Sequence, residues 1–230
     1  MPVVNNGVGS FPPIGNIVRR MAGSVGGRAV VFDFGGVLIT PITNQIGEVA
    51  ADHDVPIAVM VEILLGPLTS GQHPWHRAER GELAVAEIQG LLQPWADRHG
   101  VGLRGDELAT ILRGDGYAMV EVMTAKVAQL KRSGVTTALL TNTFAEFRPT
   151  MERDLCFDDF DHIVESFAVG ARKPEPAIYE ATRAMLGVDH RDIVYLDDFI
   201  HNIEAARDLG WTTIHVTDPH SAIELIDELL

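Results

Sequence analysis

Polar side chains follow three short apolar runs of the chain, at the point where each run ends. They comprise one carboxylate, one hydroxyl–amide pair and one pair of carboxylates: Asp33, Thr141, Asn142, Asp197 and Asp198. Ligands of an open α/β sheet bind outside the carboxyl ends of its strands, which share one edge of the sheet. If the runs are parallel strands, we therefore expect these side chains to converge although they lie far apart in the sequence.

Phosphoryl transfer through an aspartyl-phosphate requires this set of side chains. A carboxylate such as that of Asp33 can act as the nucleophile. Mg²⁺ prefers oxygen ligands, usually one or two carboxylates together with phosphate and water, and the pair Asp197–Asp198 could supply them. The transferring group also needs hydrogen-bond donors and positive charge on its oxygens.

The elements that would position these side chains alternate between strands and helices. Apolar runs rich in β-branched residues predict five strands, at 29–32, 136–140, 162–166, 192–196 and 212–216. Helical patterns are found at 119–132, 176–186, 203–209 and 221–230, and Ser221 with Glu224 predicts a capping box at the start of the last. Such alternation is typical of an α/β fold with a parallel sheet and right-handed crossovers.

Residues 43–117 interrupt this alternation. They show only helical patterns, at 44–52, 56–65, 74–79, 83–99 and 105–112. We therefore predict a helical cap inserted into a sheet domain made of residues 28–42 and 118–230, and inserted domains of this kind often act as lids. Residues 1–27 are interpreted as a flexible leader with a short helical turn at 17–21, because residues 23–28 have the composition of a linker.

Composition excludes several classes of function. The 230 residues include 32 acidic and 18 basic side chains, and the formal charge of −14 disfavours binding to nucleic acids or anionic membranes. No apolar run approaches the roughly 18 residues that span a bilayer. Cys156 is the single cysteine, which excludes an intrachain disulfide or a thiolate cluster for zinc. With no targeting signal in view, we predict a cytoplasmic protein.

Four motifs together resemble those of the haloacid dehalogenase superfamily. They stand in the superfamily's order: Asp33–Leu38, Leu140–Asn142, Lys173 within the segment Arg172–Tyr179, and Asp197–Asp198 with Asn202 four residues on. The resemblance covers nearly everything from residue 29 to the C-terminus and implies a Rossmann-like three-layer α/β core with a C1-type helical cap. The stretch His76–Leu83 is similar to caps of the branch that contains the phosphatase domain of soluble epoxide hydrolase.

The resemblance implies a magnesium-dependent phosphatase and a role for each motif residue. Asp33 would attack phosphorus, while Thr141, the amide of Asn142 and Lys173 would hold and neutralise the phosphoryl group. The predicted metal ligands are Asp33, Asp197, Asp198 and the carbonyl of Gly35, with Asn202 orienting the metal site. Gly36 would permit the tight turn after the nucleophile. The substrate would be a small phosphorylated metabolite selected by the cap, and a homodimer formed through the caps is plausible.

Gly35 departs from the superfamily's pattern. Phosphatases of the family usually carry a second aspartate there, which protonates the leaving group and later activates water, and loss of such a group can cost on the order of 10²–10⁴ in rate. Some members with a non-acidic residue at this position are nevertheless taken to be phosphatases. The cap histidines His53, His73 and His76 are possible replacements.

Two other functions stay open at this stage. A 2-haloacid dehalogenase also uses an aspartate nucleophile, although such enzymes tend to lose the carboxylates that Asp197 and Asp198 retain. A catalytically weak binding protein on the same fold is favoured only by Gly35. Aromatic residues of the inserted segment (Trp75, Trp95 and Tyr117) are interpreted as packing residues more readily than as substrate contacts. Glu79 and Arg80 could line the lid or form a salt-bridged helix end.

Overall fold

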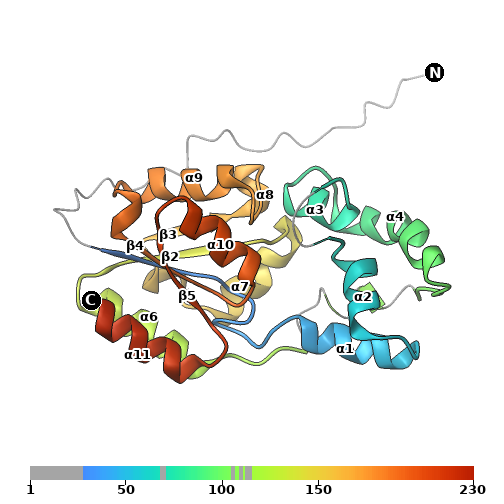
Figure 1. Ribbon diagram of the computed structural model, residues 1–230, viewed down its shortest axis with the longest axis horizontal. Helices are drawn as coiled ribbons and strands as arrows, with labels where there is room; N and C mark the ends of the chain where they lie inside the picture. Colours follow the sequence, from blue (N-terminus) through green and yellow to red (C-terminus); the bar gives the residue numbers. More distant parts are fainter. Residues whose placement is uncertain (1–27, 68–70, 105–106, 109–110, 112–115) are drawn as a thin grey trace, which may run out of the picture.

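A parallel five-stranded sheet forms the centre of the protein. The computed structural model describes residues 28–67, 71–104, 107–108, 111 and 116–230. The strands are β1 (Ala29–Phe32), β2 (Thr136–Thr141), β3 (His162–Glu165), β4 (Ile193–Asp197) and β5 (Thr212–His215). They pair in the order β3-β2-β1-β4-β5, all in parallel. Figure 1 shows this sheet between helices on either side. The five predicted strands are confirmed to within one residue at either end.

The register of the sheet explains why the motifs meet. Phe32, the last residue of the central strand, pairs with Leu139 of β2 on one side and with Leu196 of β4 on the other. Asp33 therefore leaves β1 beside the end of β2, which carries Thr141, and beside the end of β4, which carries Asp197. All four residues of β1 are buried, so this central position is fixed by packing on both faces of the sheet.

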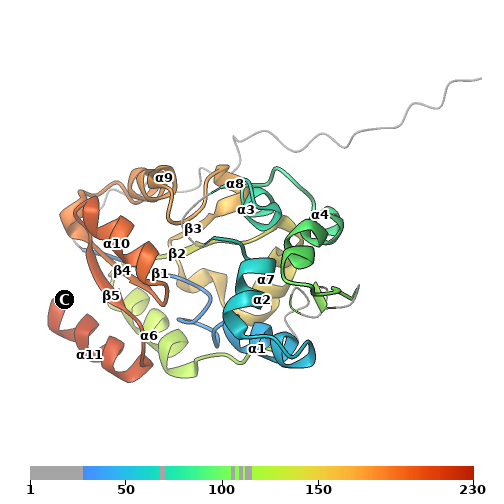
Figure 2. The ribbon, with the colours of Figure 1, turned by 45° about the vertical axis from the view of Figure 1, so that its right-hand side comes forward.

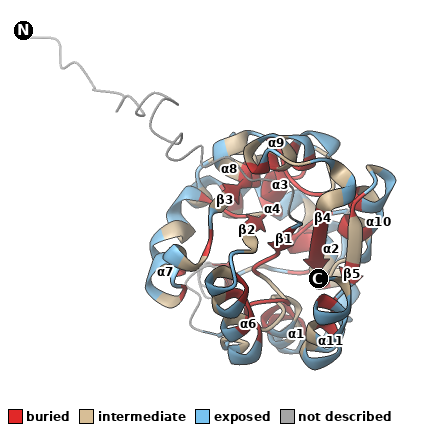
Figure 3. Cartoon of the chain, turned by 90° about the vertical axis from the view of Figure 1, so that its left-hand side faces the viewer, coloured by how far each residue is buried: buried red, intermediate tan, exposed pale blue. Residues whose placement is uncertain are grey.

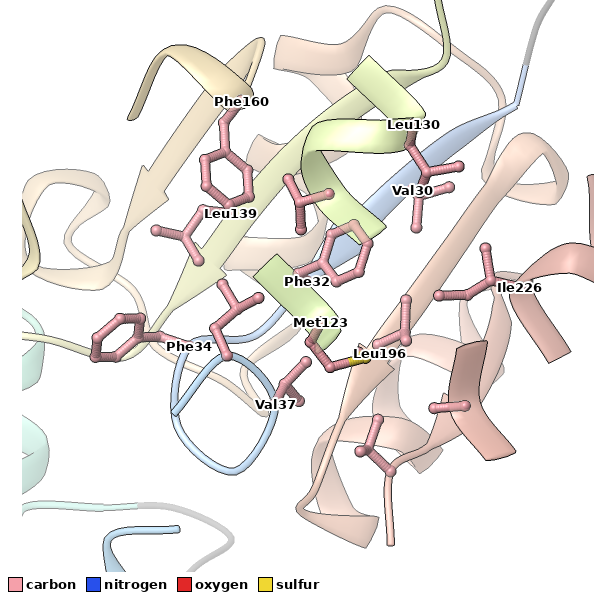
Figure 4. Close-up of a cluster of buried hydrophobic side chains, with 14 of the residues drawn as sticks. Val30, Phe32, Phe34, Val37, Met123, Leu130, Leu139, Phe160, Leu196 and Ile226 are labelled. Atoms are coloured by element: carbon pink, nitrogen blue, oxygen red, sulfur yellow. The ribbon is translucent and has the colours of Figure 1, made fainter. Parts of the chain in front are cut away.

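Helices cover one face of the sheet around a core of apolar side chains. Those helices are α6 (Glu121–Arg132), α7 (Arg148–Asp154) and α11 (Pro219–Leu229). Phe32, Leu139 and Leu196 of the strands share this core with Met123 of α6 and Ile226 of α11 (Figure 4). Because successive strand residues face opposite ways, Val31 and Leu140 point to the other side of the sheet.

The opposite face is covered by three further helices: α8 (Ser166–Val169), α9 (Pro176–Leu186) and α10 (Ile200–Asp208). Ile178 and Tyr179 of α9 and Ile203 of α10 pack there against strand residues. Figure 3 shows the buried strands in the middle, with α8 and α9 above and α6 and α11 below. The parallel α/β sheet predicted from the alternating pattern is thus confirmed, as is the three-layer core that the resemblance implied. Short 3₁₀ turns complete it: η2 (Ala145–Phe147), η3 (Phe157–Asp159) and η4 (His190–Asp192).

Between β1 and α6, the described residues include four named helices, which form a separate lobe beside the sheet (Figure 2). They are α1 (Thr43–Asp52), α2 (Ile57–Leu64), α3 (Pro74–Glu79) and α4 (Val85–Arg98). They bury a core of their own, which includes Ile46, Met60, Ile63, Ile88 and Leu92. The helical insertion is thus confirmed. The helix predicted at 105–112 falls mainly on residues outside those described, as do the leader and its predicted turn at 17–21.

The two segments that connect this lobe to the sheet domain run side by side. The amide of Thr40 donates to the carbonyl of Ala118 (2.9 Å), and the amide of Val120 donates to the carbonyl of Leu38 (2.8 Å). Between them, Ile39 and Met119 form an antiparallel bridge. The chain therefore enters and leaves the helical lobe at one place.

Some predicted helix ends were wrong. The C-terminal helix begins at Pro219 and not at Ser221, because Asp218 caps it by accepting a hydrogen bond from the amide of Ser221 (2.8 Å). Proline suits the first helical position, where no amide hydrogen is needed. The pattern at 203–209 also starts late, since α10 begins at Ile200. Among the described residues, no helix is both long and apolar enough to cross a bilayer.

Candidate active site

The side chain of Lys173 joins the carboxylates at the end of the sheet. Its ammonium Nζ lies 2.6 Å from Oδ1 of Asp33 and 2.8 Å from Oδ2 of Asp197, and it donates to the carbonyl of Leu140 (3.1 Å). Lys173 is almost fully buried, in the loop between α8 and α9. The two carboxylates raise the pKa of its ammonium against the opposing effect of burial, so Lys173 stays charged beside Asp33.

Asn142 holds this lysine in place. Its Nδ2 donates to the carbonyl of Lys173 (3.0 Å), and its Oδ1 accepts from the amide of Lys173 (2.8 Å). Thr141, the last residue of β2, is buried next to it and lines the same cavity as Asp33. The second and third motifs are therefore one structural unit, in which the amide side chain of Asn142 fixes the cation that faces Asp33.

The two adjacent aspartates differ in how their oxygens are used. Oδ1 of Asp197 accepts from the amide of Phe199 (2.7 Å), and both of its oxygens accept from Nδ2 of Asn202 (3.0 and 3.1 Å). Its Oδ2 also accepts from Lys173 and from the hydroxyl of Tyr195. Oδ1 of Asp198, by contrast, is buried without a hydrogen-bond partner. Asp198 is thus the better candidate metal ligand, and Asp197 is better placed to hold Lys173 and Asn202.

The carboxylate cluster has the donor chemistry of a divalent cation site. Asp33, Asp197 and Asp198 each offer an oxygen, and these oxygens lie within 4.8 Å of one another. Burial and the charge of Asp197 raise the pKa of Asp198 to about 7, and burial raises the pKa of Asp33 well above its usual range despite Lys173. Buried carboxylates in such excess need further positive charge, and Mg²⁺ binds through oxygen ligands of this kind. The residues therefore fit the predicted metal.

Gly35 and Gly36 lie differently in the turn after Asp33. Gly36 has a φ of +69°, and a Cβ atom there would lie 2.0 Å from Oδ2 of Asp198. Gly35 has no heavy atom within 4 Å of the place where its Cβ would stand. The turn requires glycine at position 36 only, and the space beside Gly35 is open.

A cavity of about 160 Å³ extends from Asp33 to the helical lobe. Apolar side chains from both parts of the chain make up much of its lining: Phe34, Ile39, Ile42, Leu65, Trp75, Ile111, Tyr117, Phe144, Phe147 and Phe199. Trp75 and Tyr117 thus line the cavity, although the sequence favoured a packing role. Trp95 packs against the ring of His73 at a centroid distance of 4.5 Å and does not line the cavity.

Two ion pairs connect the lobe to the sheet domain beside this cavity. Nε of Arg172 donates to Oε2 of Glu79, and both side chains are buried. Nη1 of Arg80 donates to Oε1 of Glu175 (3.0 Å). Glu79 lines the cavity, as expected of a lid residue, while Arg80 forms an ion pair at the end of α3. Each of the two interpretations offered for these residues therefore holds for one of them. The role of Arg172 could not be read from the sequence, because its partner lies in a different domain.

The three cap histidines suggested as replacements for the missing aspartate are not among the residues that line the cavity. His53 is paired with Glu107 at 2.5 Å. His73 and His76 are buried, and burial lowers their pKa values to about 4 and about 3, with the charge of Arg172 acting in the same direction. A histidine that was not singled out, His201, does line the cavity.

The sequence as a whole matches one enzyme family. The profile of the haloacid dehalogenase-like hydrolases matches residues 28–210, which include all four motifs and the helical lobe. The chain belongs to this family. The resemblance inferred from Asp33, Thr141, Lys173 and Asp198 is thereby confirmed.

Several relatives of this haloacid dehalogenase-like hydrolase are known. It is 30% identical over 206 residues to acyl-CoA dehydrogenase family member 10 of Mus musculus and 27% identical over 216 residues to bifunctional epoxide hydrolase 2 of Rattus norvegicus. Each alignment covers 88% of this chain but only 19% and 38% of the relative, so the chain spans less than two fifths of either protein. The sesquiterpene phosphatase astK of Aspergillus oryzae is 29% identical over 194 residues, which are 83% of this chain and 90% of astK.

Solved structures confirm the fold of this haloacid dehalogenase-like hydrolase. A family enzyme from Bacteroides thetaiotaomicron, determined in complex with magnesium and inorganic phosphate, superposes with a TM-score of 0.58. The match covers 82% of this chain and 93% of that one at 18% sequence identity. At this identity the comparison concerns the arrangement of sheet and helices.

Proposed function

We propose that the protein is a magnesium-dependent phosphatase that transfers the phosphoryl group of a small ester to Asp33. The observation that carries the proposal is the buried arrangement in which Lys173 faces Asp33 while Asp198 keeps an oxygen without a partner. The phosphatase relative among the matched proteins supports it. The proposal assigns Asp33, Thr141 and Lys173 to the reaction and the amide of Asn142 to phosphate binding.

The geometry around Asp33 suggests which of its oxygens reacts. Oδ1 accepts from the amide of Phe34 (2.7 Å) and pairs with Lys173, so it is held in place. Oδ2 is left to attack phosphorus, forming an aspartyl-phosphate as the bond to the leaving oxygen breaks. Lys173 offsets negative charge on the phosphoryl oxygens, and the hydroxyl of Thr141 can donate to one of them. Water then attacks the aspartyl-phosphate and releases phosphate.

Asp33, Asp198 and the carbonyl of Gly35 would hold the metal, with Asn202 and Asp197 behind them. A bound Mg²⁺ would supply positive charge that polarises the phosphoryl group. Asp197 contributes indirectly, since its oxygens already accept from Lys173 and Asn202. The protein residues thus divide into a reacting set around Asp33 and a positioning set around Asp197.

The cavity favours a phosphate ester with an apolar organic part. Its wall between Phe34 and Trp75 is largely aromatic and aliphatic, and burial of apolar surface is favourable by roughly 25 cal/mol per Å². Segment 43–117 provides several of these residues, so we assign substrate selection to it, with residues 28–42 and 118–230 as the catalytic core. The match to a sesquiterpene phosphatase agrees with an apolar substrate.

The experiment is phosphate release from a panel of phosphate esters, including 4-nitrophenyl phosphate and alkyl phosphates. It is run with Mg²⁺, with a chelator, and with Asp33→Asn and the exposed Asp208→Asn as a matched control. We expect turnover that requires Mg²⁺, survives in Asp208→Asn and falls by at least about 10⁴ in Asp33→Asn, because the nucleophile is lost. Absence of phosphate release from every ester would contradict the proposal, and chloride release from 2-chloropropionate would then indicate the dehalogenase alternative.

A further inference from the structure

In the reaction proposed above, no residue has yet been assigned to protonate the leaving group. When an alkyl phosphate is cleaved, the leaving oxygen needs a proton, and Gly35 has no side chain to donate one. Among the described residues, seven titratable side chains line the cavity: Asp33, Glu79, Tyr117, Arg172, Lys173, Asp198 and His201. Asp33, Lys173 and Asp198 already serve as nucleophile, phosphate ligand and metal ligand.

Two further candidates are occupied by strong hydrogen bonds. Glu79 accepts from Nε1 of Trp75 at one oxygen (2.9 Å) and from Arg172 at the other, so both of its oxygens are occupied. The hydroxyl of Tyr117 donates to Asp154, and burial together with that carboxylate raises its pKa above the usual range. A tyrosine held in this way is a poor donor to a leaving group at neutral pH.

His201 has the position and chemistry that the others lack. It stands in the first turn of α10, one turn after Asp198, and its side chain is 41% exposed at the rim of the cavity. Nδ1 lies 3.9 Å from Oε2 of Glu204, which leaves Nε2 on the opposite side of the ring. Imidazole is the side chain that both gives and takes a proton near neutral pH.

The surroundings of Gly35 point to the same side of the site. The neighbouring Gly36 packs against Asp198, and no atom fills the space where a side chain of residue 35 would stand. The segment after Asp198 continues through Phe199, which lines the cavity, to His201. The loop that lacks the acid and the helix that carries the imidazole therefore border one open volume.

We propose that His201 is the general acid and base of this enzyme and takes over the function that the side chain at position 35 has in relatives. The inference rests on the proposed phosphatase function. As the bond between Asp33 and phosphorus forms and the bond to the leaving oxygen breaks, Nε2 of the imidazolium gives its proton to that oxygen. The neutral ring then takes a proton from the water that attacks the aspartyl-phosphate, phosphate departs, and the imidazolium is restored.

The test compares a poor and a good leaving group in His201→Gln. Under single-turnover conditions with Mg²⁺, release of hexanol from hexyl phosphate should slow by about 10²-fold or more, since an alkoxide needs a proton. Release of 4-nitrophenolate from 4-nitrophenyl phosphate should change by less than about threefold, because that anion leaves unprotonated. His220→Gln, which alters an exposed histidine on α11, is the matched control and should affect neither substrate.

A rescue variant separates chemistry from folding. The Cβ of Gly35→Asp would stand in open space. The double variant Gly35→Asp with His201→Gln should release hexanol at least about tenfold faster than His201→Gln alone. Equal slowing of both substrates in His201→Gln and His201→Ala, or no slowing of either, would overturn the assignment. If the wild-type protein releases phosphate from no ester, the proposed function itself fails, which is distinct from a failure of the His201 assignment.

Discussion

Two adjacent glycines of the turn after Asp33 have opposite tolerance for a side chain. A residue with a Cβ at position 36 would need a left-handed backbone and would collide with the carboxylate of Asp198. At position 35 the same atom would meet open space. The fold therefore requires glycine at position 36, whereas it leaves room for a side chain at position 35.

The substitutions Gly35→Ala and Gly36→Ala test this difference. We expect Gly36→Ala to lower the free energy of unfolding by about 2 kcal/mol or more, through left-handed strain and displacement of Asp198, and to raise the Mg²⁺ concentration needed for half-maximal turnover. Gly35→Ala should stay within about 0.5 kcal/mol of the wild type. Urea unfolding and a magnesium titration of phosphate release provide the two measurements. Similar effects of the two substitutions would contradict this account of the turn.

Residues of the site were predictable where they follow a strand. Asp33, Thr141 and Asp197 were found because a parallel sheet brings the carboxyl ends of its strands together whatever their distance in sequence. His201 and Arg172 were not found, because their significance depends on what they face. No local pattern shows that Arg172 meets Glu79, which lies 93 positions away, or that a helical histidine borders the space beside Gly35.

At the level of elements, the ion pair of Glu79 and Arg172 connects α3 of the helical lobe to the loop that carries Lys173. Both side chains are buried, and Trp75 adds a second hydrogen bond to the carboxylate. Breaking such a pair leaves a charge buried without its partner, which costs about 3–5 kcal/mol, whereas removing both charges costs much less. The pair therefore fixes how the lobe sits over the cavity more than it adds stability.

A double-mutant cycle measures this coupling. Arg172→Met should lower the free energy of unfolding by about 3 kcal/mol, and Arg172→Met with Glu79→Gln should recover at least about 1 kcal/mol of that loss. Urea unfolding of the wild type, both single variants and the double variant provides the cycle. Strictly additive losses would show that the two side chains do not interact as described. The exposed pair of Arg191 and Asp189 is a suitable control, with an expected coupling below about 1 kcal/mol.

The helices also show what a sequence pattern can and cannot supply. The four strongly periodic helices of the core were predicted, since each presents an apolar stripe to the sheet. Helix α7 was missed because Met151 is its single buried residue, so it has almost no periodic signal. The start of α11 was placed too late because Ser221 and Glu224 imitate a capping box, while Asp218 before Pro219 provides the cap that forms.

At the level of the whole molecule, the buried imidazoles of His73 and His76 make the free energy of unfolding depend on pH. Their pKa values of about 4 and about 3 lie below the value of 6.5 expected in the unfolded chain, chiefly because burial disfavours the charged ring. Between pH 6.5 and these values the unfolded chain binds more protons than the folded one. The stability from these groups is therefore fully present above pH 6.5 and is lost as the pH falls.

Chemical unfolding at pH 7 and pH 5 checks this expectation. Each buried imidazole should contribute a loss of about 1–2 kcal/mol over that interval. In His76→Gln the decrease between the two pH values should be smaller by about that amount than in the wild type. His220→Gln, on the surface of α11, should keep the wild-type slope. The carboxylates of the site titrate in all three proteins alike, so an unchanged slope in His76→Gln would contradict the burial argument.

The paired connecting segments make the helical lobe exchangeable in evolution. Because the backbones of Thr40 and Ala118, and of Leu38 and Val120, are hydrogen-bonded, the chain leaves the sheet domain and returns to it at adjacent positions. The helical segment between these two connections can be lengthened or replaced while the backbone of the sheet domain keeps its path. The lining of the cavity can therefore be altered by changing the lobe alone, while Asp33, Lys173 and Asp198 keep their places in the sheet domain.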